Sequence, residues 1–123
     1  MTAPPKRSVA AALAADEWET AKRREEGVLL ILRYRTPILC PDGVEGYGRL
    51  LRILWPFETE NSGALPSTNQ SSDMELFEDR LCGVLETDSH AFLAAVLTFD
   101  GARQWVFHTS DVGECQRRLE GKA

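Results

Sequence analysis

Residues 91–108 have the sequence AFLAAVLTFDGARQWVFH, in which two apolar runs are separated by Asp100-Gly101. An Asp-Gly pair readily adopts the positive φ angles of a two-residue type I′ turn, which is the tightest connection between two strands. The sequence therefore predicts a β-hairpin, with residues 91–99 and 102–108 as neighbouring antiparallel strands.

Three more strands are predicted upstream of this hairpin. Residues 28–36 (VLLILRYRT) form an apolar run that is typical of a central strand, and residues 49–57 (RLLRILWPF) alternate as a second one. Residues 16–26 are ambiguous because their composition also suits a helix. We favour a strand there, since Trp18 stands among alternating charged neighbours and Gly27 can complete a hairpin turn.

Two helices complete the pattern. Ser72-Asp73-Met74-Glu75 fits a capping box, in which the serine oxygen and the glutamate each bind a free backbone N–H, so we expect the first helix to begin there. Apolar residues then recur at helical spacing from Met74 to Leu85. Thr109-Ser110-Asp111 is expected to cap a shorter second helix, with Cys115 on its apolar stripe.

The predicted element order is β-β-β-α-β-β-α. Strands joined by short turns favour an α+β fold, an antiparallel sheet of about five strands with two helices packed on one face. We expect residues 1–15 to be a flexible N-terminal tail and residues 16–121 to be a single α+β domain. The uncovered face of such a sheet needs polar residues or pairing, and residues 28–36, apolar on both sides, point to a homodimer.

Composition excludes several classes of function. The chain has 123 residues, with 14 Lys and Arg against 19 Asp and Glu and a formal charge of −5, which argues against direct nucleic-acid binding. No run is long enough to span a bilayer, so no membrane association is expected. Cys40, Cys82 and Cys115 lie far apart without a C-x-x-C pair, which argues against a zinc site and favours a reducing cytoplasm.

The acidic residues are unevenly distributed. Nine acids and a single base, Arg80, lie between Glu58 and Asp100, so the loop and helix of this segment should form an acidic surface. A solvated helix face that keeps the protein soluble is the simpler explanation. The alternative is a docking surface, because an acidic patch speeds association with a basic partner. The candidate partner-binding residues are Glu58, Glu60, Asp73, Glu75, Glu78 and Asp79.

No catalytic motif is present, and neither a cofactor nor a metal ion is expected. The enzymatic alternative is a small hydrolase or ligand-binding enzyme with a pocket near His90, His108 and Cys40. Four arginines on the predicted strands are candidates for holding a carboxylate or phosphate, although polar strand ends explain them more simply. They are Arg33, Arg35, Arg49 and Arg52.

Diffuse motifs follow one another along most of the chain. They are Trp18, residues 28–34, residues 50–57, Gly63-Ala64-Leu65-Pro66, the acidic helix with Leu76-Phe77-Glu78-Asp79-Arg80-Leu81, Asp100-Gly101 and Trp105-Val106-Phe107. This order resembles the bacterial domain-of-unknown-function family 695. The resemblance implies a small bacterial α+β domain and supplies no catalytic residues. His108-Thr109 departs from it, because a further aromatic residue is expected there.

These observations favour a non-enzymatic protein-binding module of the bacterial cytoplasm. Its acidic loop and helix would dock on a partner protein, and a basic partner would complement them. An inhibitor, an adaptor or an immunity-type protein fits this description.

Overall fold

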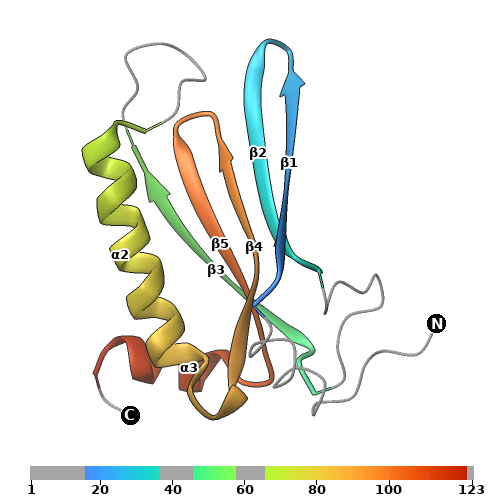
Figure 1. The fold of residues 1–123 in the computed structure, drawn as a ribbon. Helices are drawn as coiled ribbons and strands as arrows, with labels where there is room; N and C mark the ends of the chain where they lie inside the picture. Colours follow the sequence, from blue (N-terminus) through green and yellow to red (C-terminus); the bar gives the residue numbers. More distant parts are fainter. Residues whose placement is uncertain (1–15, 37–45, 58–65, 122–123) are drawn as a thin grey trace, which may run out of the picture.

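The computed structural model describes residues 16–36, 46–57 and 66–121, so the expected tail at residues 1–15 lies outside the described residues. The described elements occur in the predicted order, with a short 3₁₀ turn (η2) added before the C-terminal hairpin (Figure 1). They are β1 (Trp18–Glu25), β2 (Val28–Arg35), β3 (Arg49–Pro56), α2 (Thr68–Leu85), η2 (Thr87–Ser89), β4 (Ala91–Phe99), β5 (Ala102–Thr109) and α3 (Val112–Leu119).

All five strands form one antiparallel sheet in the order β1-β2-β4-β5-β3. The ambiguous segment at residues 16–26 is confirmed as a strand, because β1 pairs along its whole length with β2, from Trp18 opposite Arg35 to Glu25 opposite Val28. Both hairpins turn through two residues of positive φ, which is the type I′ geometry. These residues are Glu26 (φ 51°) and Gly27 (φ 83°) in the first, and Asp100 (φ 48°) and Gly101 (φ 82°) in the second.

The predicted start of the long helix is wrong by about one turn. The helix begins at Thr68, where Ser67 and Gln70 form the capping box: Ser67 Oγ accepts a hydrogen bond from Gln70 N at 3.2 Å, and Ser67 N donates to Gln70 Oε1 at 3.2 Å. Ser72 lies inside the helix and is exposed. An S-x-x-Q sequence caps as well as S-x-x-E does, and residues 68–71 include no helix breaker, so the earlier box determines the boundary.

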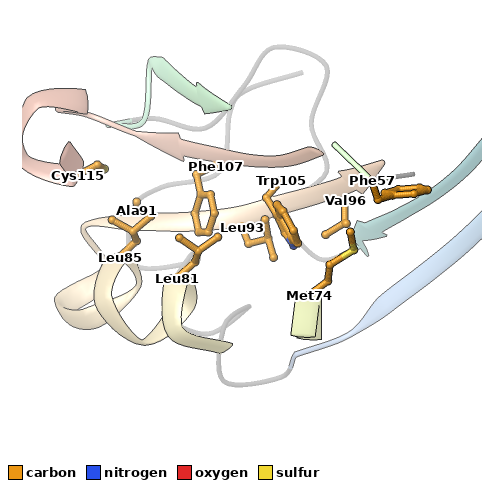
Figure 2. Packing of buried hydrophobic residues seen from close by; sticks show 10 residues of the cluster. All are labelled: Phe57, Met74, Leu81, Leu85, Ala91, Leu93, Val96, Trp105, Phe107 and Cys115. Carbon is orange, nitrogen blue, oxygen red and sulfur yellow. The ribbon is translucent and has the colours of Figure 1, made fainter. Parts of the chain in front are cut away.

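The hydrophobic core lies between one face of the sheet and both helices (Figure 2). Leu81 and Leu85 of α2 and Cys115 of α3 belong to the same buried cluster as Trp105 and Phe107 of β5. Both helices therefore pack on the same face, as predicted. Figure 1 shows α2 lying along the β3–β5 side of the sheet, away from the β1–β2 hairpin.

A β-bulge in β4 determines which of its side chains enter the core. The register with β5 shifts between Leu93 and Ala95, so Leu93 and Val96 both face the helices. Strict alternation along the strand would have sent Val96 to the opposite face, because successive side chains point to opposite sides.

The observed cap gives a direct test of the helix start. Replacing Ser67 with Ala is expected to lower the free energy of unfolding by about 1 kcal/mol, because the hydrogen bond from Gln70 N to Ser67 Oγ is lost. The matched change Ser72→Ala is expected to be neutral or stabilising by about 0.5 kcal/mol, because alanine is the better helix former. Urea unfolding of both variants measures the difference, and a larger loss for Ser72→Ala would contradict the observed boundary.

Candidate functional site

A cleft lined by charged residues separates α2 from the β1–β2 hairpin on the helix-covered face of the sheet. It contains two cavities, of about 210 and 250 Å³, which share Arg33 and Glu78. Guanidinium groups line its sheet wall and carboxylates line its helix wall. We call it the charged cleft, and its main charged residues are Arg33, Arg35, Arg103, Glu75, Glu78 and Glu86.

Glu78 lies at the junction of the two cavities. Its Oε1 atom forms an ion pair with Arg33 of β2 and accepts a hydrogen bond from Trp105 Nε1 of β5 at 2.9 Å. The carboxylate therefore joins α2 to two strands of the sheet. Sequence analysis proposed Glu78 as a partner contact, but the structure directs this side chain inward and leaves it only 20% exposed.

Arg35 is the most deeply buried charge of the cleft, with 3% of its side chain exposed. Its Nη2 atom lies 3.2 Å from Glu86 Oε2, and its Nε donates to the Leu93 carbonyl oxygen at 3.0 Å. The guanidinium stacks 4.5 Å above the ring of Trp18, and the guanidinium of Arg33 lies 4.9 Å from the same ring. Such cation–π contacts strengthen where water is excluded.

Glu86 satisfies both Arg35 and the backbone of β4. The same Oε2 atom accepts a hydrogen bond from Leu93 N at 2.8 Å. Burial raises the pKa of Glu86 above its ordinary value, while the Leu93 N–H and the charge of Arg35 oppose this rise. Glu86 is therefore a desolvated carboxylate whose charge depends on its cationic partner.

Arg103, like Glu86, is a member of the cleft that was not among the residues proposed from the sequence. Its Nε atom donates to Thr98 Oγ1 at 3.0 Å, and burial lowers the pKa of the guanidinium while the charge of Glu78 opposes that change. Alternation could have revealed it, because Arg103, Trp105 and Phe107 must share one face of a strand. Of the four arginines proposed earlier, only Arg33 and Arg35 lie here.

The other two candidate arginines lie elsewhere. Arg49 is an exposed residue of the edge strand β3, at the end opposite Thr109. Arg52 pairs with Val106, whose side chain lies on the face away from the helices. The four arginines therefore do not form one anion site.

Three carboxylates of α2 are exposed to solvent, and two of them, Glu75 and Asp79, also line the charged cleft. Asp73, Glu75 and Asp79 form no ion pair with any residue in the described part of the chain. Leu76 of the same helix has 58% of its surface exposed, and the cavity of about 280 Å³ next to it is lined by Asp73, Arg80 and Trp55 of β3. We call Leu76 and the three carboxylates the outer α2 surface. Glu58 and Glu60, the remaining candidates, lie outside the described residues.

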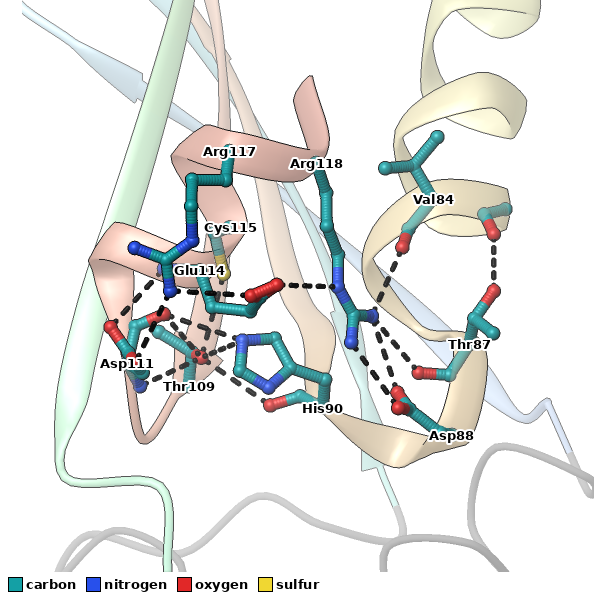
Figure 3. A network of polar contacts seen from close by, with 11 residues as sticks. Val84, Thr87, Asp88, His90, Thr109, Asp111, Glu114, Cys115, Arg117 and Arg118 are labelled. Carbon is teal, nitrogen blue, oxygen red and sulfur yellow. Dashed lines mark hydrogen bonds and ion pairs between the residues drawn. The ribbon is translucent and has the colours of Figure 1, made fainter. Parts of the chain in front are cut away.

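The two histidines lie on opposite faces of the sheet. His90 Nε2 is 3.3 Å from the Asp111 carbonyl oxygen and 3.4 Å from Thr109 Oγ1, on the helix side (Figure 3). His108 stacks on Phe92, with ring centroids 5.1 Å apart, on the other side. One substrate therefore cannot reach both imidazoles, and Cys40 lies outside the described residues.

The described thiols are poor nucleophiles. Burial, with the charges of Glu86 and Glu78, raises the pKa of Cys82 to about 12, so the thiolate is not populated at neutral pH. Cys115 is fully buried in the core. Its Sγ atom lies 3.5 Å from Thr109 Oγ1, which fixes it in the polar network of Figure 3.

Arg118 ties α3 to the end of α2 in the same network. Its Nη1 and Nη2 atoms each lie 3.2 Å from an oxygen of Asp88, and Nη1 also donates to the Thr87 carbonyl oxygen at 3.3 Å (Figure 3). The bidentate pair holds Asp88 in its left-handed conformation, with φ at 57°. These contacts are accounted for by the packing of the C-terminal helix.

Comparison with known families identifies the family of this chain. A family model described as "Family of unknown function (DUF695)" matches residues 16–122. The chain belongs to the DUF695 family. This match confirms the resemblance drawn from the order of its motifs. No curated protein and no solved structure matches the chain.

Membership of DUF695 supplies no catalytic residues, so function must be argued from this chain. Within residues 16–36, 46–57 and 66–121, no three His, Cys, Asp or Glu side chains gather in a way that would hold a metal ion. In the same ranges, no helix is long and apolar enough to cross a membrane.

The buried ion pair of the cleft predicts a large effect on stability. Arg35→Leu is expected to lower the free energy of unfolding by about 3–5 kcal/mol at pH 7, because Glu86 stays buried without its cation. The loss should shrink at pH 5, since a protonated Glu86 leaves no uncompensated charge. Urea unfolding at both pH values measures this. The control Arg49→Leu, at an exposed position, should change stability by less than about 0.5 kcal/mol.

His108 predicts a second dependence on pH. Burial lowers the pKa of its imidazole, so below about pH 6.5 the unfolded chain binds a proton that the folded chain does not. The free energy of unfolding should therefore fall as the pH drops from 7.5 to 5. In His108→Leu this contribution is absent and the pH dependence should be shallower. Parallel stability curves for the two proteins would refute the assignment.

Proposed function

We propose that this DUF695 protein is a non-enzymatic protein-binding module of the bacterial cytoplasm, which docks a basic partner protein on the outer α2 surface. The observation that carries the proposal is the combination of an exposed leucine with unpaired carboxylates. Leu76 is 58% exposed, and Asp73, Glu75 and Asp79 of the same helix are exposed without an ion pair in the described part of the chain. Arg80 is the one base of this helix and lines the same cavity as Leu76.

The other acids near α2 differ in this respect. Glu78, Glu86 and Asp88 each have an arginine partner within the chain. Uncompensated carboxylates attract a basic partner from a distance, and an exposed apolar side chain on the same helix supplies contact area that charge alone does not. An inhibitor, an adaptor or an immunity-type protein uses such a surface.

The contacts in the charged cleft support this role because they hold α2 in place on the sheet. Glu78 fastens α2 to β2 and β5, so the outer α2 surface is held in one position before a partner arrives. A preorganised surface loses less conformational entropy on binding. The free thiols of Cys82 and Cys115 support a reducing compartment.

The test compares two variants that change the net charge equally. Glu75→Lys with Asp79→Lys alters the outer α2 surface, and Glu17→Lys with Glu26→Lys alters exposed acids elsewhere. Glu78 is left unchanged because it holds the helix in place. Tagged proteins capture partners from the source cell at low salt, and the stoichiometric partner is then purified and its binding kinetics are measured.

We expect the outer-surface variant to reduce the association rate about tenfold or more at low salt, and by less at high salt, because screening weakens steering. The control variant should bind almost as the wild type does. A partner retained equally by both variants, or no partner retained by the wild type, would overturn the proposal.

A further inference from the structure

The sheet has a second face that neither described helix covers. The buried side chains of α2 and α3 all belong to the core cluster on the first face. On the second face, Leu54 is 60% exposed and Phe99 37% exposed, and a mainly apolar hollow of about 370 Å³ is lined by Leu30, Leu97 and Phe99. We call this side the open face. An exposed apolar patch rimmed by polar residues is typical of an interaction surface.

The strand register arranges the open face in rows that cross the sheet. One row runs from Glu19 on β1 through Tyr34, Ala95 and Val106 to Arg52 on β3. It therefore carries an acid at one edge of the sheet and a base at the other. The Tyr34 hydroxyl donates to Glu19 Oε2 at 2.8 Å, which holds the carboxylate in place.

The next row has complementary sizes instead of charges. It runs from Ala21 on β1 through Leu32, Leu97 and Gln104 to Leu54 on β3. A small side chain stands at the β1 edge and a large exposed one at the β3 edge. In both rows, therefore, the two ends complement each other.

We propose that a second copy of this chain packs on the open face, about a twofold axis parallel to the strands. Because β4 is the middle strand of five, such an axis places the β1 edge of one copy over the β3 edge of the other. Glu19 of one copy then faces Arg52 of the other, and Leu54 faces Ala21. Each contact occurs twice, as an isologous interface requires.

The size of the open face suits a stable dimer. At one end of the open face Tyr47 packs on Phe92 and leaves it only 1% exposed, so about six residues of each strand are free. Five strands spaced about 4.8 Å apart, each rising about 3.3 Å per residue over those six residues, give on the order of 500 Å² per copy. The sum over two copies is about the 1,000 Å² that a specific interface needs. Packed sheets align within about 30°, and the long Arg52 side chain can span the resulting offset at the edges.

The dimer leaves the outer α2 surface facing solvent on both copies, so it does not rest on the proposed function. Two substitutions of exposed leucines distinguish the proposed dimer from the proposed partner binding. Leu54→Asp should abolish the dimer and preserve partner binding, whereas Leu76→Asp should preserve the dimer and weaken partner binding.

Sedimentation velocity of the full chain, from about 1 to 100 µM, tests the proposal. We expect a species of twice the 13.7 kDa chain mass. Glu19→Arg or Arg52→Glu alone should weaken the dimer about tenfold, because two attractions become two repulsions. The two changes together should restore it to within about threefold of the wild type.

Three results would overturn the proposal. The first is a full chain that is monomeric at every concentration. The second is a charge swap that fails to restore the dimer. The third is a loss of dimer in Leu76→Asp as large as that in Leu54→Asp.

Discussion

The carboxylate of Glu78 is the contact on which the arrangement of this protein depends. One of its oxygens, Oε1, forms an ion pair with the Arg33 guanidinium and accepts a hydrogen bond from the Trp105 indole N–H. Glu78 thereby connects α2 to strands from both hairpins. Without it, the body of α2 would rest on the sheet mainly through apolar contacts, which have no preferred direction, and Glu86 at its C-terminal cap would be left to supply polar contacts with the sheet. The pair of polar contacts fixes the rotation of the helix, and that rotation leaves Asp73, Leu76 and Asp79 in solvent.

Much of the fold was predictable because its signals are local. Asp100-Gly101 specifies a turn through the backbone conformations that those two residues tolerate, and the apolar runs beside it supply the strands. The predicted start of α2 was wrong because two capping boxes lie five residues apart, and no helix breaker between them forces the helix to begin at the later one. The bulge at Leu93–Ala95 has no local signal, since tertiary packing selects it.

The site was less predictable than the fold. Glu78 resembles its acidic neighbours in sequence, and only the folded structure shows that it contacts Arg33 and Trp105 while Glu75, at the same cleft, stays exposed. His90 directly precedes β4 and His108 lies near the end of β5, so both residues are at the same end of the sheet. The turn before β4 and the alternation of side chains along β5 nevertheless place the two imidazoles on opposite faces. Pairings such as Arg35 with Glu86 join distant segments, which a single sequence does not reveal.

The strand order has a consequence for how the molecule folds and opens. Each hairpin joins residues that are adjacent in the chain, so β1–β2 and β4–β5 can form early and independently. The seam between β2 and β4 pairs residues 30–34 with residues 95–99 and must wait until a long loop closes. That seam, with the Arg33 and Arg35 ion pairs beside it, is where the native state is expected to open reversibly. The β1–β2 hairpin then detaches as a unit, while the hydrogen bonds within each hairpin stay protected from exchange with solvent.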